Sequence, residues 1–286
     1  MKALAPTTKC SVWRSEHLFN MDFAYYTLTH HSFSRHFHEY YVIELVLNGA
    51  DSFYCDGKDY LAETDQLVLI NPSEVHTGNT FLDVPLHYFS LNPPKETLQS
   101  IAASLSITLS NDFCFEQSLI KNPYLSQKLK VLLKSFHNGS HDLLQQEIFY
   151  DCMHELLSPI ENKTTESKFL NEKDKRIELV VEYLRSHYKE DISLEKLAGM
   201  VCIDPCYFIR LFKKQIGVSP YDYLLILRTE SAKQLLREGY KVQDAALESG
   251  FYDASHLNRM FLKIAAASPK QFRLSKSQHR TSFTVL

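Results

Sequence analysis

A short stretch near the C-terminus, Gly250 to Phe261 (GFYDASHLNRMF), groups residue types that can recognise a nucleic acid. Asp253 suits a helix N-cap, because its carboxylate can accept hydrogen bonds from the free backbone N–H groups of a first turn. In the helix that would follow, Leu257 and Phe261 fall on one face. The opposite face carries Ser255, Asn258, Arg259 and Leu262. Asn and Arg can each pair with a base edge through two hydrogen bonds, so this face could read DNA, or it could be an ordinary surface helix.

A second group of residues, in RHFHEYYVIELVLNG and NPSEVH, carries side chains that can ligate metal ions. In a strand, His36, His38 and Glu44 project from the same face, and His76 follows later in the chain. Together they are the ligand set of a cupin metal site. The same groups could instead line a pocket or cap strand ends without metal, and ligand-type residues at such spacing are common by chance. We therefore predict no metal site and no cofactor.

A pocket for a small effector inside a barrel is the favoured use of these residues. Its expected lining is Arg35, His38, Tyr40, Glu44 and His76. A cationic or polar lining would suit a small polar effector. The alternate residues of the same strand could line the barrel instead; these are Tyr41, Ile43, Leu45 and Leu47.

The totals describe a chain of 286 residues, long enough for two domains of ordinary size. Its net charge of −3 hides an asymmetry, because residues 172–280 carry 19 Lys/Arg and 14 Asp/Glu, a net of +5, and the remainder has a net of −8. A basic C-terminal part joined to an acidic N-terminal part fits a nucleic-acid reader with a separate sensor. The six scattered cysteines resemble neither a disulfide framework nor a zinc motif. We therefore expect the cysteines to be reduced thiols in a cytoplasmic protein. No apolar run reaches the ~18 residues of a membrane span.

Short strands with turn signals are expected from about residue 22 to residue 92. Asn48-Gly49 and Asp56-Gly57 suit hairpin turns, because Asn, Asp and Gly tolerate the positive φ that such turns require. The apolar runs QLVLINP and PLHYFSLNPP are further strands, each stopped by proline. This spacing is typical of a sandwich or small barrel. Helical periodicity over residues 124–136 and 141–157 then predicts a helical hairpin packed on the barrel, and one of its helices could also form a dimer seam.

The polar stretch ENKTTESK has no apolar periodicity and indicates a linker. We expect an N-terminal domain over residues 1–160, a linker over 161–171 and a C-terminal domain over 172–280. The last of these is predicted to be helical, with short helix, tight turn, second helix units over 193–214 and 242–263. A helix-turn-helix presents its second helix to the major groove, and two units held apart by a rigid helix can enter successive grooves about 34 Å apart.

The C-terminal hundred residues resemble the AraC/XylS family of bacterial transcription regulators. The resemblance rests on ISLEKLAGMVCIDPCYFIRLFKKQIGVSPYDYLLILRTESAKQLL and AALESGFYDASHLNRMFLKIAAASPKQFR. The N-terminal half is similar, through HFHE and INPSEVH, to the cupin-like sensor of such regulators. The resemblance implies an α+β protein with a cupin-like β-barrel and helical hairpin, then an all-α domain with two helix-turn-helix motifs. The sequence departs from the family's usual Ser, Ile, Lys and Gly at Asp204, Ala245, Leu262 and Ala266.

Helical geometry and the family's pattern together assign the contacts with DNA. The base-reading residues are expected to be Cys206, Ile209 and Arg210 on the first recognition helix and Ala254, Ser255, Asn258 and Arg259 on the second. Candidate phosphate contacts, which position a protein without specifying sequence, are Lys213, Lys214, Lys263 and Arg273. The same pattern assigns Phe208, Leu211, Phe212, Leu257 and Phe261 to the core. The alternative for each Arg or Lys is a solvated surface charge.

These features predict a sequence-specific DNA-binding transcription regulator, and not an enzyme. The expected partners are promoter double-stranded DNA, a small-molecule effector, RNA polymerase and a second copy of the chain, with no membrane. Activation is the commoner role in the resembling family, which favours an activator. Two alternatives stay open: a ligand-independent regulator that uses its barrel for dimerisation, and a metal-dependent cupin enzyme with an accessory helical domain.

Overall fold

The computed structural model describes residues 7–81, 83–160, 174–265 and 267–274. The chain divides into two units: the first contains the described residues up to 32 and from 38 to 160, and the second contains those from 174 to 273 together with residues 33–37. The first is rich in sheet and the second is helical, which confirms the predicted α+β class. The predicted domain limits stay a prediction, and the linker at 161–171 lies outside the described residues.

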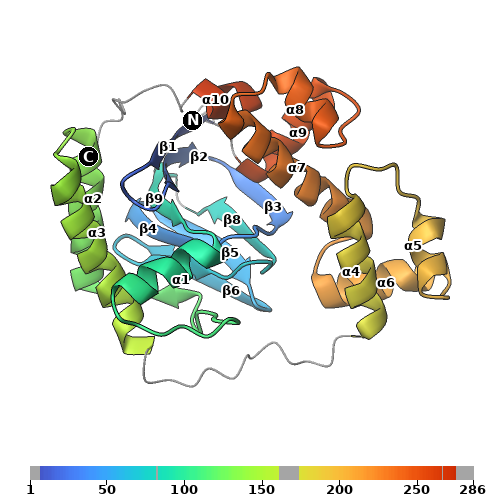
Figure 1. Ribbon diagram of the computed structural model, residues 1–286, viewed down its shortest axis with the longest axis horizontal. Helices are drawn as coiled ribbons and strands as arrows, with labels where there is room; N and C mark the ends of the chain where they lie inside the picture. The colour runs from blue at the N-terminus through green and yellow to red at the C-terminus, as the bar shows by residue number, and fades with distance from the viewer. Residues whose placement is uncertain (1–6, 82, 161–173, 266, 275–286) are drawn as a thin grey trace. The chain divides into compact units, whose positions relative to one another are not determined.

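The strands form two sheets, shown in Figure 1, and they belong to the N-terminal unit except for residues 33–36 of β3. Six strands form one sheet in the order β1-β2-β9-β4-β7-β10, and four form the other in the order β3-β8-β5-β6. The strands are β1 (Thr7–Ser15), β2 (Met21–Thr29), β3 (Ser32–His36), β4 (Val42–Asn48), β5 (Ala50–Cys55), β6 (Lys58–Glu63), β7 (Leu67–Ile70), β8 (His76–Thr80), β9 (Leu86–Asn92) and β10 (Leu119–Ile120). Neighbours in the larger sheet are antiparallel, as are β5 with β6 and with β8.

Of the two predicted hairpin turns, only Asp56-Gly57 joins paired strands, β5 and β6; the Asn48-Gly49 prediction was wrong, because β4 and β5 belong to different sheets. Gly49 has φ +81°, and a Cβ added there would stand 2.9 Å from the carbonyl oxygen of Pro85, so glycine is required for conformation and for space. Asp56 and Gly57 both adopt positive φ between β5 and β6. One strand, β1, lies ahead of the predicted strand region, because its segment TTKCSVWRS is mostly polar and gives little apolar signal.

Helices cover one face of the larger sheet. They are α1 (Lys95–Ser104), α2 (Pro123–His137) and α3 (Asp142–Leu157), followed by the short 3-10 helix η1 (Ser158–Ile160). α2 and α3 pack side by side as the predicted hairpin (Figure 1). Leu132 and Leu133 of α2 are fully buried in the same apolar core as Ile43 and Leu45 of β4. Shortening either leucine to alanine would cost about 2–5 kcal/mol of stability.

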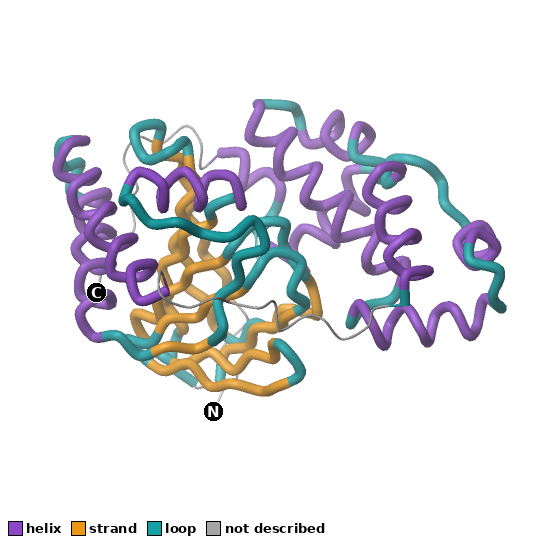
Figure 2. The backbone as a smooth tube through the Cα atoms, turned by 60° about the horizontal axis from the view of Figure 1, so that its bottom comes forward, coloured by secondary structure: helices purple, strands orange, loops and turns teal. Residues whose placement is uncertain are grey.

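The C-terminal unit contains α4 (Lys175–His187), α5 (Leu194–Met200), α6 (Pro205–Ile216), α7 (Pro220–Glu238), α8 (Val242–Glu248), α9 (Ala254–Ala265) and α10 (Pro269–Leu274), coloured as helix in Figure 2. The expected caps are present: the side chains of Ser193, Asp204 and Ser219 each accept a backbone N–H of the helix that follows. Gly217 and Gly239 end α6 and α7 in the left-handed conformation. In the described part of the chain, no helix is long and apolar enough to cross a membrane.

Candidate nucleic-acid interface and effector site

The first helix-turn-helix consists of α5 and α6. The chain between them reverses through Cys202, which has φ +54°. Leu197 of α5 and the fully buried Phe208 and Phe212 of α6 hold the pair to the core, and the two phenylalanine rings meet edge to face at 5.7 Å. Because one face of α6 is fixed in the core, the other is presented to solvent.

The outward face of α6 carries the residues predicted to contact DNA. Cys206 and Arg210 are exposed and Ile209 is half-buried, so the three predicted base readers lie on the free side. Lys213 and Lys214, the candidate phosphate contacts, are exposed in the last turn. Leu211, which was expected in the core, is only half-buried.

The second helix-turn-helix consists of α8 and α9, and Gly250 shapes the turn between them. Its φ is +85°, and an added Cβ would stand 2.9 Å from the Cα of Lys189 and 3.0 Å from the Nε of Arg228. Asp253 caps α9 as predicted, because its carboxylate accepts the backbone N–H of His256 at 2.7 Å. The turn and the cap together set the direction in which α9 leaves the core.

α9 has the same division of faces as α6. Leu257 and Phe261 are fully buried, as predicted from their spacing. The four predicted base readers lie on the other side: Ser255 and Arg259 are exposed, and Ala254 and Asn258 are half-buried. His256 lies beside them, and its pKa is lowered first by burial and then by the charge of Arg259.

The cations on these faces have no acidic partner within the described part of the chain. Arg210, Arg259, Lys213, Lys214 and Lys263 are all exposed and form no ion pair there. Arg273 of α10 has the same properties. Unpaired cations attract phosphate without first losing an internal partner. Leu262 is 44% exposed on α9, where a lysine in its place would add one more such charge.

The central helix α7 contacts α6, α8 and α9, so it joins the two motifs. It has 19 residues and is therefore about 28 Å long. Arg228 anchors it, because its guanidinium donates to the carbonyl oxygens of Tyr188 and Glu190, both at 2.7 Å. Arg228 was not predicted from the sequence, although it is a single cation directly after the apolar run YLLIL.

In the N-terminal unit, β4 is buried on both faces, and alternation places Glu44 on the same face as Val42 and Val46. Ile43, Leu45 and Tyr41 face the helices in the apolar core, so they do not line the interior as the alternative prediction had it. Glu44 is only 9% exposed and projects from the opposite face. Its pKa is raised well above the ordinary value by burial and then by the charge of Asp51 on β5. That face of β4 therefore looks onto the second sheet.

The structure places four of the five predicted effector residues among buried or half-buried side chains. His38 and His76 are buried with ring centroids 5.2 Å apart, and Tyr40 stacks on His38 at 4.7 Å. Arg35 is the exception, because it is exposed on β3. Within β3, alternate side chains point to opposite sides of the strand, so Arg35 lies on the opposite side from the buried His36.

Sequence reasoning missed three members of this inner face, namely Tyr26 of β2, Asp51 of β5 and Tyr88 of β9. Tyr26 and Tyr88 are register partners whose rings stack at 4.7 Å. The charge of Glu44 contributes to raising the pKa of both tyrosines, after burial, so both lie near it. Period-two alternation along DFAYYTL and LHYFSLN was a signal for them, but alternation does not show which face is inside.

The candidate metal ligands are also partly assembled. His38 and His76 lie together in the N-terminal unit, with ring centroids 5.2 Å apart, whereas His36 belongs to the other unit. Nδ1 of His36 bonds to the carbonyl oxygen of Ser34 at 2.7 Å, and Nδ1 of His76 bonds to that of Glu74 at 2.9 Å. Glu44, the fourth member of the predicted set, is not in this group.

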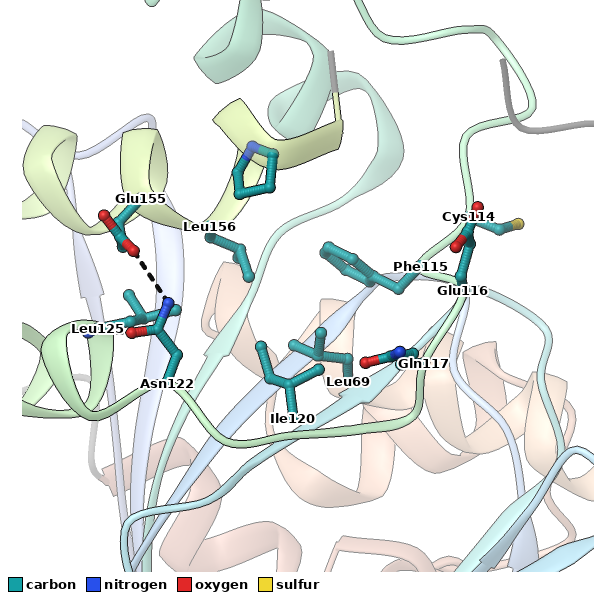
Figure 3. Close-up of a pocket in the computed structure, with 11 residues that line it drawn as sticks. Leu69, Cys114, Phe115, Glu116, Gln117, Ile120, Asn122, Leu125, Glu155 and Leu156 are labelled. Carbon is teal, nitrogen blue, oxygen red and sulfur yellow. Dashed lines mark hydrogen bonds between the residues drawn. The ribbon is translucent and has the colours of Figure 1, made fainter. Parts of the chain in front are cut away.

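A separate cleft of about 190 Å³ lies between β7, β10 and the helical hairpin (Figure 3). Its walls are mainly apolar, with Leu69, Ile120 and Leu156 directed toward the hollow. At its edge the Asn122 amide donates to the Glu155 carboxylate at 3.0 Å. This cleft was not predicted, because its residues come from separate segments with no common motif.

Comparison with known proteins identifies both units. Residues 19–153 match the AraC-like ligand binding domain, and residues 197–275 match a helix-turn-helix domain. The chain belongs to the AraC/XylS family of transcription regulators. It is 29% identical over 226 residues to the HTH-type transcriptional regulator YbfI of Bacillus subtilis, with 79% of this chain and 81% of YbfI covered. It is 24% identical over 250 residues to the lactose operon transcription activator of Staphylococcus xylosus, with 85% of each chain covered.

A solved structure of apo ToxT from Vibrio cholerae matches with a TM-score of 0.57 at 12% identity, covering 96% of this chain and 98% of ToxT. This likeness supports the two-domain fold alone. The relatives are transcription regulators, so the prediction that this AraC/XylS-family chain is a DNA-binding regulator and not an enzyme is confirmed. Its N-terminal domain is of the ligand-binding type.

Proposed function

We propose that this AraC/XylS-family regulator activates transcription by inserting α6 and α9 into successive major grooves of a promoter. The proposal rests on one observation: each helix has 12 residues, a buried aromatic face and an outward face with an arginine that has no ion-pair partner in the described residues. The base-reading residues in this proposal are Cys206, Ile209, Arg210, Ala254, Ser255, Asn258 and Arg259. The phosphate contacts are Lys213, Lys214, Lys263 and Arg273.

The proposed signal is a small effector bound by the N-terminal domain at the inner face that contains His38, Tyr40, Glu44 and His76. An effector can act only by binding one arrangement of the protein better than another. A homodimer, contact with RNA polymerase and action in the cytoplasm, where promoter DNA lies, belong to the same proposal. The match to a ligand-binding domain supports the effector.

The DNA-reading part is tested by selecting bound fragments from random DNA with the pure full-length protein at a stated salt concentration. We expect enrichment of two short conserved blocks about one helical turn apart. Arg210→Ala should relax the preference in one block, and Arg259→Ala should relax it in the other. No enrichment, with the full chain or with residues 172–286, would reject the proposed insertion of α6 and α9 into successive major grooves.

The activator part has its own test. Transcription from a promoter with the selected site should rise when the protein is added to purified bacterial RNA polymerase. A fall in transcript would make the protein a repressor and leave the DNA-reading proposal intact. Unchanged effects in the presence of cell extract and metabolite panels would favour the ligand-independent regulator.

A further inference from the structure

Two carboxylates lie on the inner face of the N-terminal unit. Glu44 of β4 is 9% exposed and Asp51 of β5 is 7% exposed. Asp51 accepts one hydrogen bond, from the backbone N–H of Asn79 at 2.9 Å. The carboxylate of Glu44 has neither a hydrogen bond nor an ion pair with any residue that the structure describes.

Burying these two acids lowers the stability of the folded state unless a bound ligand compensates for the lost hydration. A buried carboxylate without a donor or cation loses several kcal/mol of hydration that nothing replaces. Here the second acid makes the cost larger, because the two negative charges repel. Both groups respond with raised pKa values, caused first by burial. A hydrophobic pair of the same size would stabilise the empty domain better, so the acids point to something that the domain binds.

Aromatic rings border the same place. Tyr88 lies on β9 opposite Val46, and Glu44 lies opposite Ser90, so Tyr88 and Glu44 are diagonal neighbours on one face. Tyr26 stacks on Tyr88 with an interplanar angle of 23° and remains partly exposed. The π face of a tyrosine attracts a cation, by about 0.5–2 kcal/mol depending on how dry the site is. The acid groups and the ring faces therefore both favour a cationic ligand.

We propose that the effector is a small organic cation whose ammonium group binds between Glu44 and Asp51, against the rings of Tyr26 and Tyr88. This inference rests on the proposed effector site and names the chemical class of its ligand. A carboxylate ligand would gain no cationic partner there, and its charge would oppose ionisation of both acids, whereas an ammonium group would favour it. The unsaturated fatty acid named for a ToxT structure, at 14% identity and a TM-score of 0.51, is thus the charge class that this site would reject.

The test measures the melting temperature of the full chain with three probes of similar size: n-butylammonium, n-butanol and butyrate, with choline as a permanently charged fourth. Ligands that bind only the folded protein raise Tm in proportion to affinity and concentration. We expect the two cations to raise Tm and the alcohol and the anion to leave it unchanged. Direct titration should show at least about tenfold weaker cation binding in Glu44→Gln, the loss of one charged partner.

Glu44→Gln is suited to this test because it keeps the volume and removes a buried charge, so the variant should fold with an unchanged or higher Tm. Asp51→Asn should weaken cation binding in the same way. The matched control is Glu63→Gln, which neutralises an exposed carboxylate on β6 of the same unit and should leave binding unchanged.

Three results would overturn the inference. Stabilisation by butanol or butyrate that is indifferent to Glu44→Gln would leave the proposed effector site in place with another ligand class. Stabilisation by Zn²⁺ that is lost in His38→Ala and His76→Ala would assign the site to a metal. No change in Tm or DNA binding with any probe, metal or metabolite panel would reject the effector site as well.

Discussion

At the scale of single residues, the outward faces of α6 and α9 mix two kinds of contact. Arginine and asparagine have fixed arrays of donors that match base edges, whereas lysine is a flexible point charge. Arg210, Asn258 and Arg259 therefore carry the sequence information in this proposal. Lys213, Lys214 and Lys263 raise affinity for any DNA.

The substitution Arg259→Ala separates these two kinds of contact. We expect a loss of about 1–3 kcal/mol on the selected site and a relaxed preference at one base, because a bidentate pair is removed. Equilibrium binding to the selected site and to scrambled DNA measures both. The matched control is Arg176→Ala, since Arg176 is exposed but held by the Asp174 carboxylate on α4. Equal weakening on all sequences would make Arg259 a phosphate contact.

A second prediction at this scale concerns Asp51, whose pKa is raised by burial to about 7. The folded state keeps a proton that the unfolded chain loses near pH 4, so the stability that this group contributes is present at low pH and is lost as the pH rises through about 7. Asp51→Asn cannot ionise and keeps the acceptor for the Asn79 N–H. We expect the variant to be more stable than the parent by about 1–3 kcal/mol at pH 8 and nearly equal at pH 4. Urea unfolding at both pH values measures this, and a gap that stays constant with pH would contradict it.

At the scale of elements, prediction succeeded where a backbone conformation or a helix end requires a particular type of residue. Ser193, Asp204 and Ser219 mark helix starts because only a short polar side chain reaches the free N–H groups of a first turn. Asp56-Gly57 marks the hairpin between β5 and β6 because both residues adopt positive φ. The strand β1 (Thr7–Ser15) and the helix α1 (Lys95–Ser104) were missed, because both gain their stability from contacts with distant segments and not from local signals.

The turn before α9 gives the prediction that belongs to this scale. Gly250→Ala forces a side chain into positive φ and places a Cβ 2.9 Å from the backbone of Lys189. We expect a destabilisation of more than about 1 kcal/mol, with weaker DNA binding because α9 is redirected. The matched control is Gly199→Ala in α5, where an added Cβ meets nothing within 4 Å; there, alanine should be neutral or stabilising by up to about 1 kcal/mol. If both variants melt alike, the close approach at Gly250 carries no structural weight.

At the scale of the whole molecule, the sequence predicted a separate function for each unit. It located the outward helix faces of the C-terminal unit better than the inner face of the N-terminal unit. The C-terminal faces were predictable because helical periodicity states which side is apolar, as Leu257 and Phe261 show. The N-terminal site was not, because β4 is buried on both faces. Alternation groups Glu44 apart from Ile43 and Leu45, yet only the packing of helices on one side shows that Glu44 faces inward.

The division of charge between the units leads to a last prediction about salt. Residues 172–280 have a net charge of +5, and each phosphate contact that they make releases counterions, so the logarithm of the binding constant should fall linearly with the logarithm of salt concentration. Since the contacts belong to one unit, the full chain and residues 172–286 should have the same slope on the selected site. Lys263→Ala should reduce the slope by about 1, whereas Lys58→Ala, which removes an exposed lysine from β6, should leave it unchanged. A steeper slope for the full chain, sensitive to Lys58, would mean that the N-terminal unit also touches the DNA backbone and that reader and sensor are not separate.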